Sequence, residues 1–139
     1  GGGILSGLGV AARARRPAIR VIGVEPEGAH TMRLSVDRGS AQKIAKAVTV
    51  ADGLAAPMAG ELTYAHVHQL ALEIVTVPDS AIIGAMWTII ERCKVLAEPA
   101  AAAGLAALLT GAVKVEPGAS VVCVVTGGNA DREKLKALA

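Results

Sequence analysis

The sequence predicts an α/β fold in which helices cover both faces of a parallel sheet. Three short apolar runs, at residues 19–25, 73–77 and 121–125, have the length and the β-branched composition of buried parallel strands. Segments with helical spacing of their apolar residues separate these runs. Strands that alternate with helices imply a parallel sheet, and ligands of such sheets bind at the carboxyl ends of the strands.

Helices are expected between and around these strands. Residues 4–14 carry apolar side chains at helical spacing, and this first helix is expected to end near Arg16 and Pro17. The segment 100–109 consists almost wholly of Ala, Leu and Gly, so we expect a buried helix that lies close to its neighbours on several sides. Other helices are expected at residues 29–38, 60–72 and 81–96, with a short polar helix at the end of the chain.

Length, composition and charge exclude several classes of protein. The 139 residues fit one small α/β domain or part of a larger one, and 53% of them are apolar, nearly all aliphatic. A net charge of +2 and the near absence of aromatic residues argue against a nucleic-acid partner. The apolar runs are too short to span a bilayer and no signal peptide is visible, so no membrane partner is expected.

The cysteine and histidine positions predict neither a disulfide nor a metal site. Cys93 and Cys123 lie far apart without a CxxC pattern, which predicts reduced, buried thiols in a cytosolic protein. His66 and His68 would point in directions about 200° apart on a helix, so they cannot share a metal. His30 is interpreted as a surface polar residue in preference to a metal ligand.

The glycine cluster at residues 1–7 (GGGILSG) is the first candidate site. It places glycine amides at the start of a helix, where unpaired N–H groups and the positive end of the helix dipole can bind a phosphate. A flexible terminus or a simple turn is the structural alternative. A dinucleotide fingerprint, with Gly3, Gly7 and Gly9 about twenty residues before Glu25, is a second functional alternative. The strand that normally precedes such glycines is missing, so we expect a fragment, a piece of a nicked enzyme, or a subunit completed by another chain.

The second candidate is the sequence TGGN at residues 126–129. Thr126 places a hydroxyl at the carboxyl end of the predicted central strand, where a ligand of a parallel sheet would bind. An ordinary tight turn is the alternative for this segment. Glu98 is interpreted as a charge at the N-terminus of the helix that Pro99 begins, with a pocket carboxylate as its alternative.

Six blocks of the sequence, taken in order, resemble successive blocks of serine/threonine dehydratases and serine racemases, which are pyridoxal-phosphate enzymes of fold type II. These blocks are GGGILSG, VIGVEPEGA, VADGLA, IVTVPDSAIIGAM, ERCKVLAEPAAAAGLAALL and VVTGGN. The resemblance covers nearly the whole chain and implies a tryptophan synthase β-like fold. It identifies residues 1–139 as the C-terminal part of the catalytic domain, without the N-terminal segment that carries the Schiff-base lysine.

The resemblance also assigns residues to the cofactor, pyridoxal 5′-phosphate. It implies that the phosphate binds Gly1, Gly2, Gly3 and the backbone of Ile4. It implies that the hydroxyl of Thr126, which replaces the family's more common serine, contacts the pyridine nitrogen. A neutral hydroxyl does not favour protonation of that nitrogen as a carboxylate would, so the cofactor is a weaker electron sink, which suits β-elimination.

No catalytic residue and no metal site are expected in this chain. Some relatives bind a divalent cation through positions that match Glu25, Ala29 and an acid two residues further on. Thr31 stands at that last position here and removes a charged oxygen ligand. None of the chain's lysines matches the family's lysine motif, so the chain alone is expected to be inactive. These lysines are Lys43, Lys46, Lys94, Lys114, Lys134 and Lys136.

The function that the resemblance implies is the conversion of L-threonine or L-serine to a 2-oxo acid and ammonia, in cytoplasmic amino-acid metabolism. The alternatives are a serine racemase-type isomerase, a Rossmann-type dinucleotide-binding module, and a non-catalytic assembly partner. The expected partners are the missing N-terminal portion or a complementary chain, a small amino-acid substrate, and further copies in a homo-oligomer.

Overall fold

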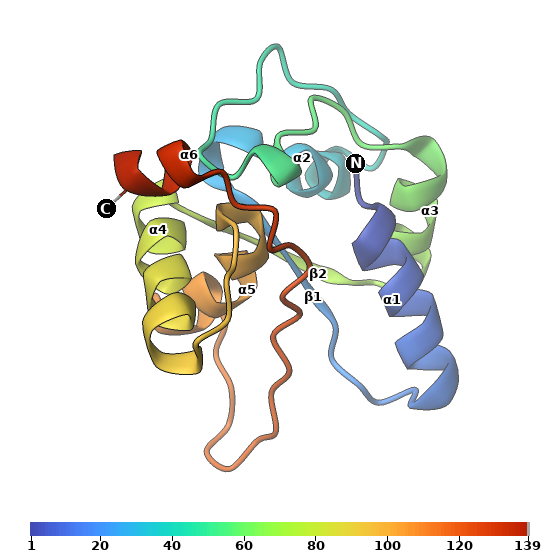
Figure 1. The fold of residues 1–139 in the computed structure, drawn as a ribbon. Helices are drawn as coiled ribbons and strands as arrows, with labels where there is room; N and C mark the ends of the chain where they lie inside the picture. Colours follow the sequence, from blue (N-terminus) through green and yellow to red (C-terminus); the bar gives the residue numbers. More distant parts are fainter. Residues whose placement is uncertain (139) are drawn as a thin grey trace.

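The computed structural model describes residues 1–138 and is built around a two-stranded parallel sheet. Strand β1 (Ile22–Pro26) pairs with β2 (Glu73–Val77), so that Ile22 lies opposite Glu73 and Pro26 lies opposite Val77. The helices are α1 (Gly3–Arg15), α2 (Thr31–Arg38), α3 (Glu61–Gln69), α4 (Asp79–Thr88), α5 (Pro99–Leu109) and α6 (Arg132–Ala137), as Figure 1 shows. Shorter turns are η1 (Glu27–Ala29), η2 (Asp52–Leu54) and the π-helical η3 (Ile89–Cys93).

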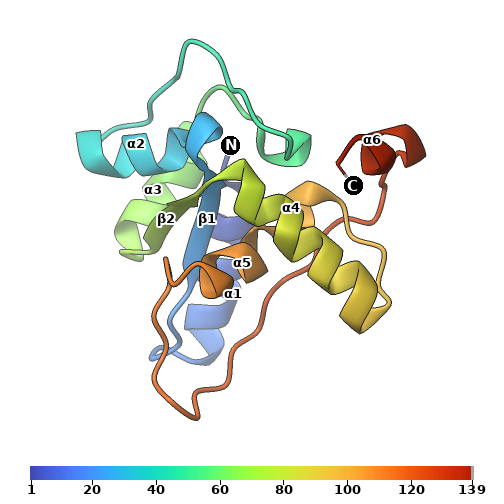
Figure 2. The same ribbon diagram turned by 90° about the vertical axis from the view of Figure 1, so that its left-hand side faces the viewer.

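Helices cover both faces of the sheet, which confirms the predicted α/β class. In Figure 1 the strands pass between α4 and α5 on one side and α1 and α3 on the other, and Figure 2 gives the view at right angles. The strands alternate between the two cores, since Val75 and Val77 face α5 while Ile74 joins the cluster beneath α1 and α3. Each face of the sheet therefore has its own apolar core.

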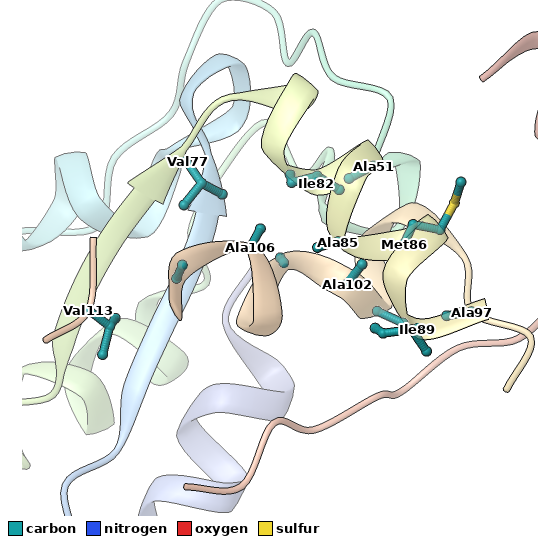
Figure 3. Packing of buried hydrophobic residues seen from close by; sticks show 13 residues of the cluster. Ala51, Val77, Ile82, Ala85, Met86, Ile89, Ala97, Ala102, Ala106 and Val113 are labelled. Carbon is teal, nitrogen blue, oxygen red and sulfur yellow. The ribbon is translucent and has the colours of Figure 1, made fainter. Parts of the chain in front are cut away.

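The core on the α4 and α5 side is formed by small side chains, as the composition of the segment 100–109 predicts. Ala102 and Ala106 of α5 are fully buried, and they belong to the same cluster as Ile82, Ala85 and Met86 of α4, which Figure 3 shows. A single methyl group at these positions lets the two helices and the sheet approach closely while interior space stays filled. The alanine bias of the sequence is therefore a packing requirement.

Two glycines permit a similarly close approach on the opposite face. A Cβ at Gly23 of β1 would lie 2.5 Å from Leu5 Cδ2 and 2.8 Å from Ile74 Cδ1. A Cβ at Gly9 of α1 would lie 2.6 Å from Leu72 Cδ1. A side chain at either position would displace these leucine and isoleucine side chains, so the two glycines favour the close packing of α1 against the sheet.

The prediction of a strand at residues 121–125 is wrong for this chain as folded. The structure assigns no strand there, and Val122 is 86% exposed. Among residues 1–138, no backbone hydrogen bond pairs this run with another segment. Its composition suits a buried strand, but a strand also requires a neighbouring backbone, which local sequence cannot supply.

Other predictions are confirmed with shifted boundaries or corrected in part. The helix predicted at residues 81–96 begins at Asp79 and ends with η3 at Cys93, where Lys94 adopts a left-handed conformation with φ 58°. Cys93 is exposed and Cys123 is half-buried, so the expectation of buried thiols is wrong for Cys93. Within residues 1–138, no helix combines the length and the apolar character needed to cross a bilayer.

The packing of α5 predicts opposite effects for two substitutions in that helix. Ala106→Leu forces three extra carbons into a filled interior and should lower the free energy of unfolding by about 1–3 kcal/mol. Gly104→Ala meets only Cys123 Cβ at 3.9 Å and should leave stability unchanged or raise it by up to about 1 kcal/mol. Urea unfolding of the 139-residue chain measures both, and equal losses in the two variants would contradict this account of the core.

Candidate functional site

The glycine loop at the start of α1 has a conformation that requires glycine at one position. Gly2 is the N-cap residue of α1 and adopts a left-handed conformation with φ 88° and ψ 4°. A Cβ there would lie 2.3 Å from Met32 Cε and 3.1 Å from Thr63 Oγ1. Backbone conformation and space therefore both exclude a side chain at Gly2.

The N-terminal end of α3 holds this loop in place. The hydroxyl of Thr63 lies within hydrogen-bond distance of the carbonyl oxygens of Gly1 and Gly60. The N–H of Gly60 also donates to Gly1 O at 3.3 Å, and the buried Ser6 donates its hydroxyl to Gly3 O at 3.1 Å. The carbonyl groups of the loop are thus engaged by protein donors, whereas the N–H groups of Gly2, Gly3 and Ile4 donate to no other residue within residues 1–138.

Those N–H groups form a site suited to an anion. No side chain caps the start of α1, and its first turn contains no acidic residue. Gly1, Gly3 and Ile4 are exposed, and a Cβ at Gly3 would meet nothing within 4 Å. The first N–H groups of a helix have no partner within the helix, and the dipole adds positive potential where they point. The loop accordingly has the features of an anion-binding site, and its use for a phosphate stays a prediction.

The TGGN loop is anchored on the residue that precedes α5. The N–H of Glu98 donates to Gly127 O at 3.0 Å. A Cβ at Gly127 would lie 2.2 Å from Glu98 Oε1, and one at Gly128 would lie 2.9 Å from Leu96 O. Gly128 is therefore required by its contact with the backbone of Leu96, whereas a side chain at Gly127 would displace the side chain of Glu98. Thr126 is exposed, and within residues 1–138 its hydroxyl makes no hydrogen bond, so it is available to a ligand.

Glu98 has a larger structural role than the sequence suggests. It is the N-cap residue of α5, yet its side chain caps nothing. The carboxylate lies instead between two loops, with Oε1 3.4 Å from the Cβ position of Gly53 as well as against Gly127. It faces a cavity of about 290 Å³ that is also lined by Thr49, Asn129 and Lys134. The pocket-carboxylate alternative therefore describes Glu98 better than the helix-charge interpretation.

The two predicted loops occupy separate places in the structure. Gly3 lines a shallow groove between α1 and α3, together with Gly7, Val10 and His66. Asn129, next to the TGGN glycines, lines the cavity at Glu98. No hydrogen bond joins the two loops within the described part of the chain. Each loop is held by its own neighbours, the first by α3 and the second by the start of α5.

Glu25 serves α2 in this structure. Its two carboxylate oxygens accept the N–H groups of Met32 at 2.9 Å and Arg33 at 2.8 Å, and the N-cap residue His30 makes no side-chain cap. The hydroxyl of Thr31 donates to Ala56 O at 3.3 Å and is likewise engaged. Within residues 1–138 no cluster of three or more His, Cys, Asp or Glu side chains is arranged to hold a metal ion. The carboxylate of Glu25 thus caps the start of α2 with both of its oxygens.

Comparison with known proteins identifies the family. The model of the pyridoxal-phosphate dependent enzyme family matches residues 1–127. The chain belongs to this family. The chain is 39% identical over 132 residues to the L-threonine ammonia-lyase of Thermotoga maritima, and this match covers 94% of the chain and 32% of that protein. It is 38% identical to the serine racemase of Arabidopsis thaliana, with 94% of the chain and 40% of that protein covered.

Solved structures in this family have the same fold. The structure of maize serine racemase superimposes with a TM-score of 0.89 at 38% identity, which covers 99% of the chain and 43% of the maize chain. The processed form of threonine deaminase isoform 2 from Solanum lycopersicum superimposes with a TM-score of 0.87 at 29% identity, which covers 99% of the chain and 40% of that protein. The chain therefore spans less than half the length of these relatives.

Membership in this family confirms pyridoxal phosphate as the cofactor and the fold type II architecture that the sequence blocks predict. It also favours a pyridoxal-phosphate site over the dinucleotide-binding alternative. The expectation that the chain corresponds to the C-terminal part of its relatives is not confirmed by these matches. The assignment of Gly1, Gly2, Gly3, Ile4 and Thr126 to the cofactor stays a prediction.

The geometry of the glycine loop predicts different effects for neighbouring substitutions. Gly2→Ala places a Cβ in a left-handed residue and against Thr63, so it should lower the free energy of unfolding by about 1–2 kcal/mol. Gly3→Ala adds a methyl group in open space within a helix, so it should not destabilise the chain. Urea unfolding followed by circular dichroism compares the pair, and a destabilising Gly3→Ala would contradict the open loop.

The position of Glu25 predicts a pH dependence of stability. Burial raises the pKa of its carboxyl above the ordinary value of 4.5, although the N–H groups of Arg33 and Met32 act in the opposite direction. Because the folded state binds this proton more tightly than the unfolded state, the stabilisation is present below pH 4.5 and is lost as the pH rises through the folded-state pKa. The free energy of unfolding of the natural chain, relative to Glu25→Gln, should therefore be higher near pH ~4 than near pH ~7.

Glu27→Gln is the matched control for this measurement. Glu27 lies two residues away, is exposed, and makes no side-chain hydrogen bond within residues 1–138. The comparison of the natural chain with Glu27→Gln should not show the pH dependence expected for Glu25→Gln. A flat difference for Glu25→Gln between the two pH values would refute the burial of this carboxyl.

Proposed function

We propose that this chain binds the phosphate and the pyridine ring of pyridoxal 5′-phosphate within a lyase that converts L-threonine or L-serine to a 2-oxo acid and ammonia. The observation that carries the proposal is the uncapped glycine N-terminus of α1, with exposed N–H groups and no acidic residue in its first turn, in a chain of this family. The names of the relatives, L-threonine ammonia-lyase among them, support this reaction class.

The glycine loop takes the phosphate end of the cofactor in this proposal. The N–H groups of Gly1, Gly2, Gly3 and Ile4 donate to the phosphate oxygens, and the α1 dipole stabilises their negative charge. Thr63 holds the loop through Gly1 O, so these donors are oriented before the ligand arrives. Preorganised backbone donors lose little conformational entropy on binding, which raises affinity.

The TGGN loop takes the ring end. Thr126 offers a neutral hydroxyl to the pyridine nitrogen, and Gly127 fixes this loop against Glu98. Bound pyridoxal phosphate supplies an electron sink for the negative charge that develops at the α-carbon of the amino acid. A hydroxyl at the ring nitrogen does not favour protonation there as a carboxylate would. This electronic setting suits loss of the substrate's β-hydroxyl, which relieves the charge quickly.

The lysine that carries the cofactor lies outside these 139 residues in this proposal. The six lysines of the chain do not match the family's lysine motif. The chain alone is therefore proposed to be inactive, and activity requires the segment that supplies the lysine. A serine racemase-type reaction is the second candidate, because relatives with that name are 38% identical to the chain.

Binding of a cofactor analogue tests the phosphate site directly. Pyridoxine 5′-phosphate has no aldehyde, so it cannot react with surface lysines. Added to the 139-residue chain, it should raise the melting temperature and give measurable heat in titration calorimetry, whereas pyridoxine, which lacks the phosphate, should do neither. Gly3→Ala should weaken this binding at least about tenfold, because the added methyl group occupies the space through which the phosphate approaches.

Gly111→Ala serves as the matched control away from the site. Its Cβ would meet nothing within 4 Å, although its φ of 73° makes some loss of stability expected. Binding of pyridoxine 5′-phosphate to this variant should match that of the natural chain. Equal binding of pyridoxine and its phosphate, or full binding by a folded Gly3→Ala variant, would refute the proposed phosphate site.

A further inference from the structure

Residues 48–54, which we call the bridging segment, are bonded to the chain just beyond the carboxyl ends of both strands. Beyond β1, the N–H of Val48 donates to Gly28 O at 2.9 Å. Beyond β2, the side chain of Asp79 accepts two hydrogen bonds from the same segment. Ligands of parallel sheets bind at the carboxyl ends of the strands, so the bridging segment lies where a ligand of this fold is expected.

Asp79 uses both of its carboxylate oxygens on this segment. Its Oδ1 accepts the hydroxyl of Thr49 at 2.6 Å, and its Oδ2 accepts the N–H of Val50 at 2.8 Å. The Thr49 oxygen in turn accepts the N–H of Ala51 at 3.0 Å. Asp79 is the first residue of α4, yet no side-chain hydrogen bond caps the start of that helix. The carboxylate therefore orders the bridging segment instead of its own helix.

The middle of the bridging segment needs such a restraint because it has no regular structure. Residues 48–51 belong to no helix or strand, and η2 begins only after them. Irregular backbone lacks the repeated hydrogen bonds of helices and strands, so its polar groups need other partners. Thr49 and Val50 line the cavity at Glu98, so the hydrogen bonds of Asp79 fix one wall of that cavity.

The other side of the bridging segment lies against the residue that anchors the TGGN loop. A Cβ at Gly53 would lie 3.4 Å from Glu98 Oε1, so the backbone there approaches the start of α5 closely. The N–H of Glu98 donates to Gly127 O at 3.0 Å. A continuous series of contacts thus runs from the carboxylate of Asp79, through the bridging segment and Glu98, to the TGGN loop.

The ion pair at the end of the bridging segment restrains it less than Asp79 does. Asp52 pairs with Lys134 of α6, but the two side chains are 62% and 65% exposed, and exposed pairs contribute little. The hydrogen bonds of Asp79 are partly buried, and hydrogen bonds to a charged group are stronger than those between neutral groups. Removal of Asp79 should therefore free the middle of the segment.

We propose that Asp79 is a positioning residue for the ring end of the cofactor, and that it acts through Thr49 and the bridging segment on Glu98 and the TGGN loop. The inference rests on the proposed function, in which the TGGN loop takes the pyridine ring. Within the described chain Asp79 does not line the cavity, so it acts through other residues. The glycine loop is held separately by Thr63, so loss of Asp79 should impair binding of the ring and spare binding of the phosphate.

Two ligands separate the ring end from the phosphate end. Titration calorimetry of the 139-residue chain measures the dissociation constants of inorganic phosphate and of pyridoxine 5′-phosphate, and their ratio gives the contribution of the ring. Asp79→Ala should lower this ratio at least about fivefold and leave the affinity for inorganic phosphate unchanged. Thr49→Val, which keeps the shape of the side chain and removes the hydroxyl, should have the same effect and decides the matter where Asp79→Ala does not fold.

Asp37→Ala is the matched control for these variants. Asp37 also accepts from a neighbouring side chain, Arg33 of α2, and within the described residues it does not line the cavity. This variant should keep the ratio of the natural chain. A purely structural role of Asp79 would change the two dissociation constants together or would change neither.

Hydrogen exchange followed by NMR tests the same series of contacts without a ligand. In Asp79→Ala the amides of Val50, Ala51 and Glu98 should exchange at least about tenfold faster than in the natural chain, because the segment that holds them is released. The amide of Gly60, which donates to Gly1 O at the glycine loop, should keep its exchange rate. Asp37→Ala should alter none of these amides.

The outcomes distinguish this inference from the function on which it rests. A natural chain that binds pyridoxine 5′-phosphate no better than inorganic phosphate would overturn the proposed function and this inference with it. A natural chain that shows the preference, together with a folded Asp79→Ala or Thr49→Val variant that keeps it, would overturn this inference alone. Unchanged exchange at Glu98 in Asp79→Ala, or equal loss of affinity for the two ligands, would do the same.

Discussion

Close packing around α5 is the constraint on which the rest of the structure depends. This helix contacts β1, β2, α4 and η2, and its buried face is made almost entirely of alanine. Because the side chains are small, several elements can approach one helix at once without voids. The residue before α5, Glu98, then contacts the TGGN loop, so the packing that builds the core also positions a candidate ligand loop.

Glycine occupies the positions of the two candidate loops for different physical reasons. Gly2 is required by its left-handed backbone and by its contact with Thr63, and Gly128 is required by its contact with the carbonyl oxygen of Leu96. Gly3 has neither requirement, because its φ is helical and the space around its Cβ position is open. A helical glycine that nothing within the protein demands costs stability relative to alanine. An approaching phosphate is the requirement that explains it in the proposed function.

The structure also shows that Glu25 caps a helix, although its position in the sequence suits a ligand-binding acid. Glu25 has the spacing of a dinucleotide acid and the position of a cation ligand in some relatives, but both of its oxygens accept N–H groups at the start of α2. His30, the N-cap residue, contributes no side-chain cap, so removal of Glu25 would leave those donors unpaired. Capping of α2 by a side chain from β1 therefore explains why residue 25 is acidic.

Local sequence was sufficient to predict the fold class, the β2 strand at residues 73–77, the buried alanine helix and the family. These predictions depend on the spacing of apolar residues, on composition and on the order of short motifs, and all three can be read directly from the sequence. Three other features emerged only from the folded chain: residues 121–125 have no strand partner, Glu25 caps α2, and Glu98 lies against Gly127. Each of these depends on which segments come together in space, and a pairing partner or a close contact exists only once the fold has formed.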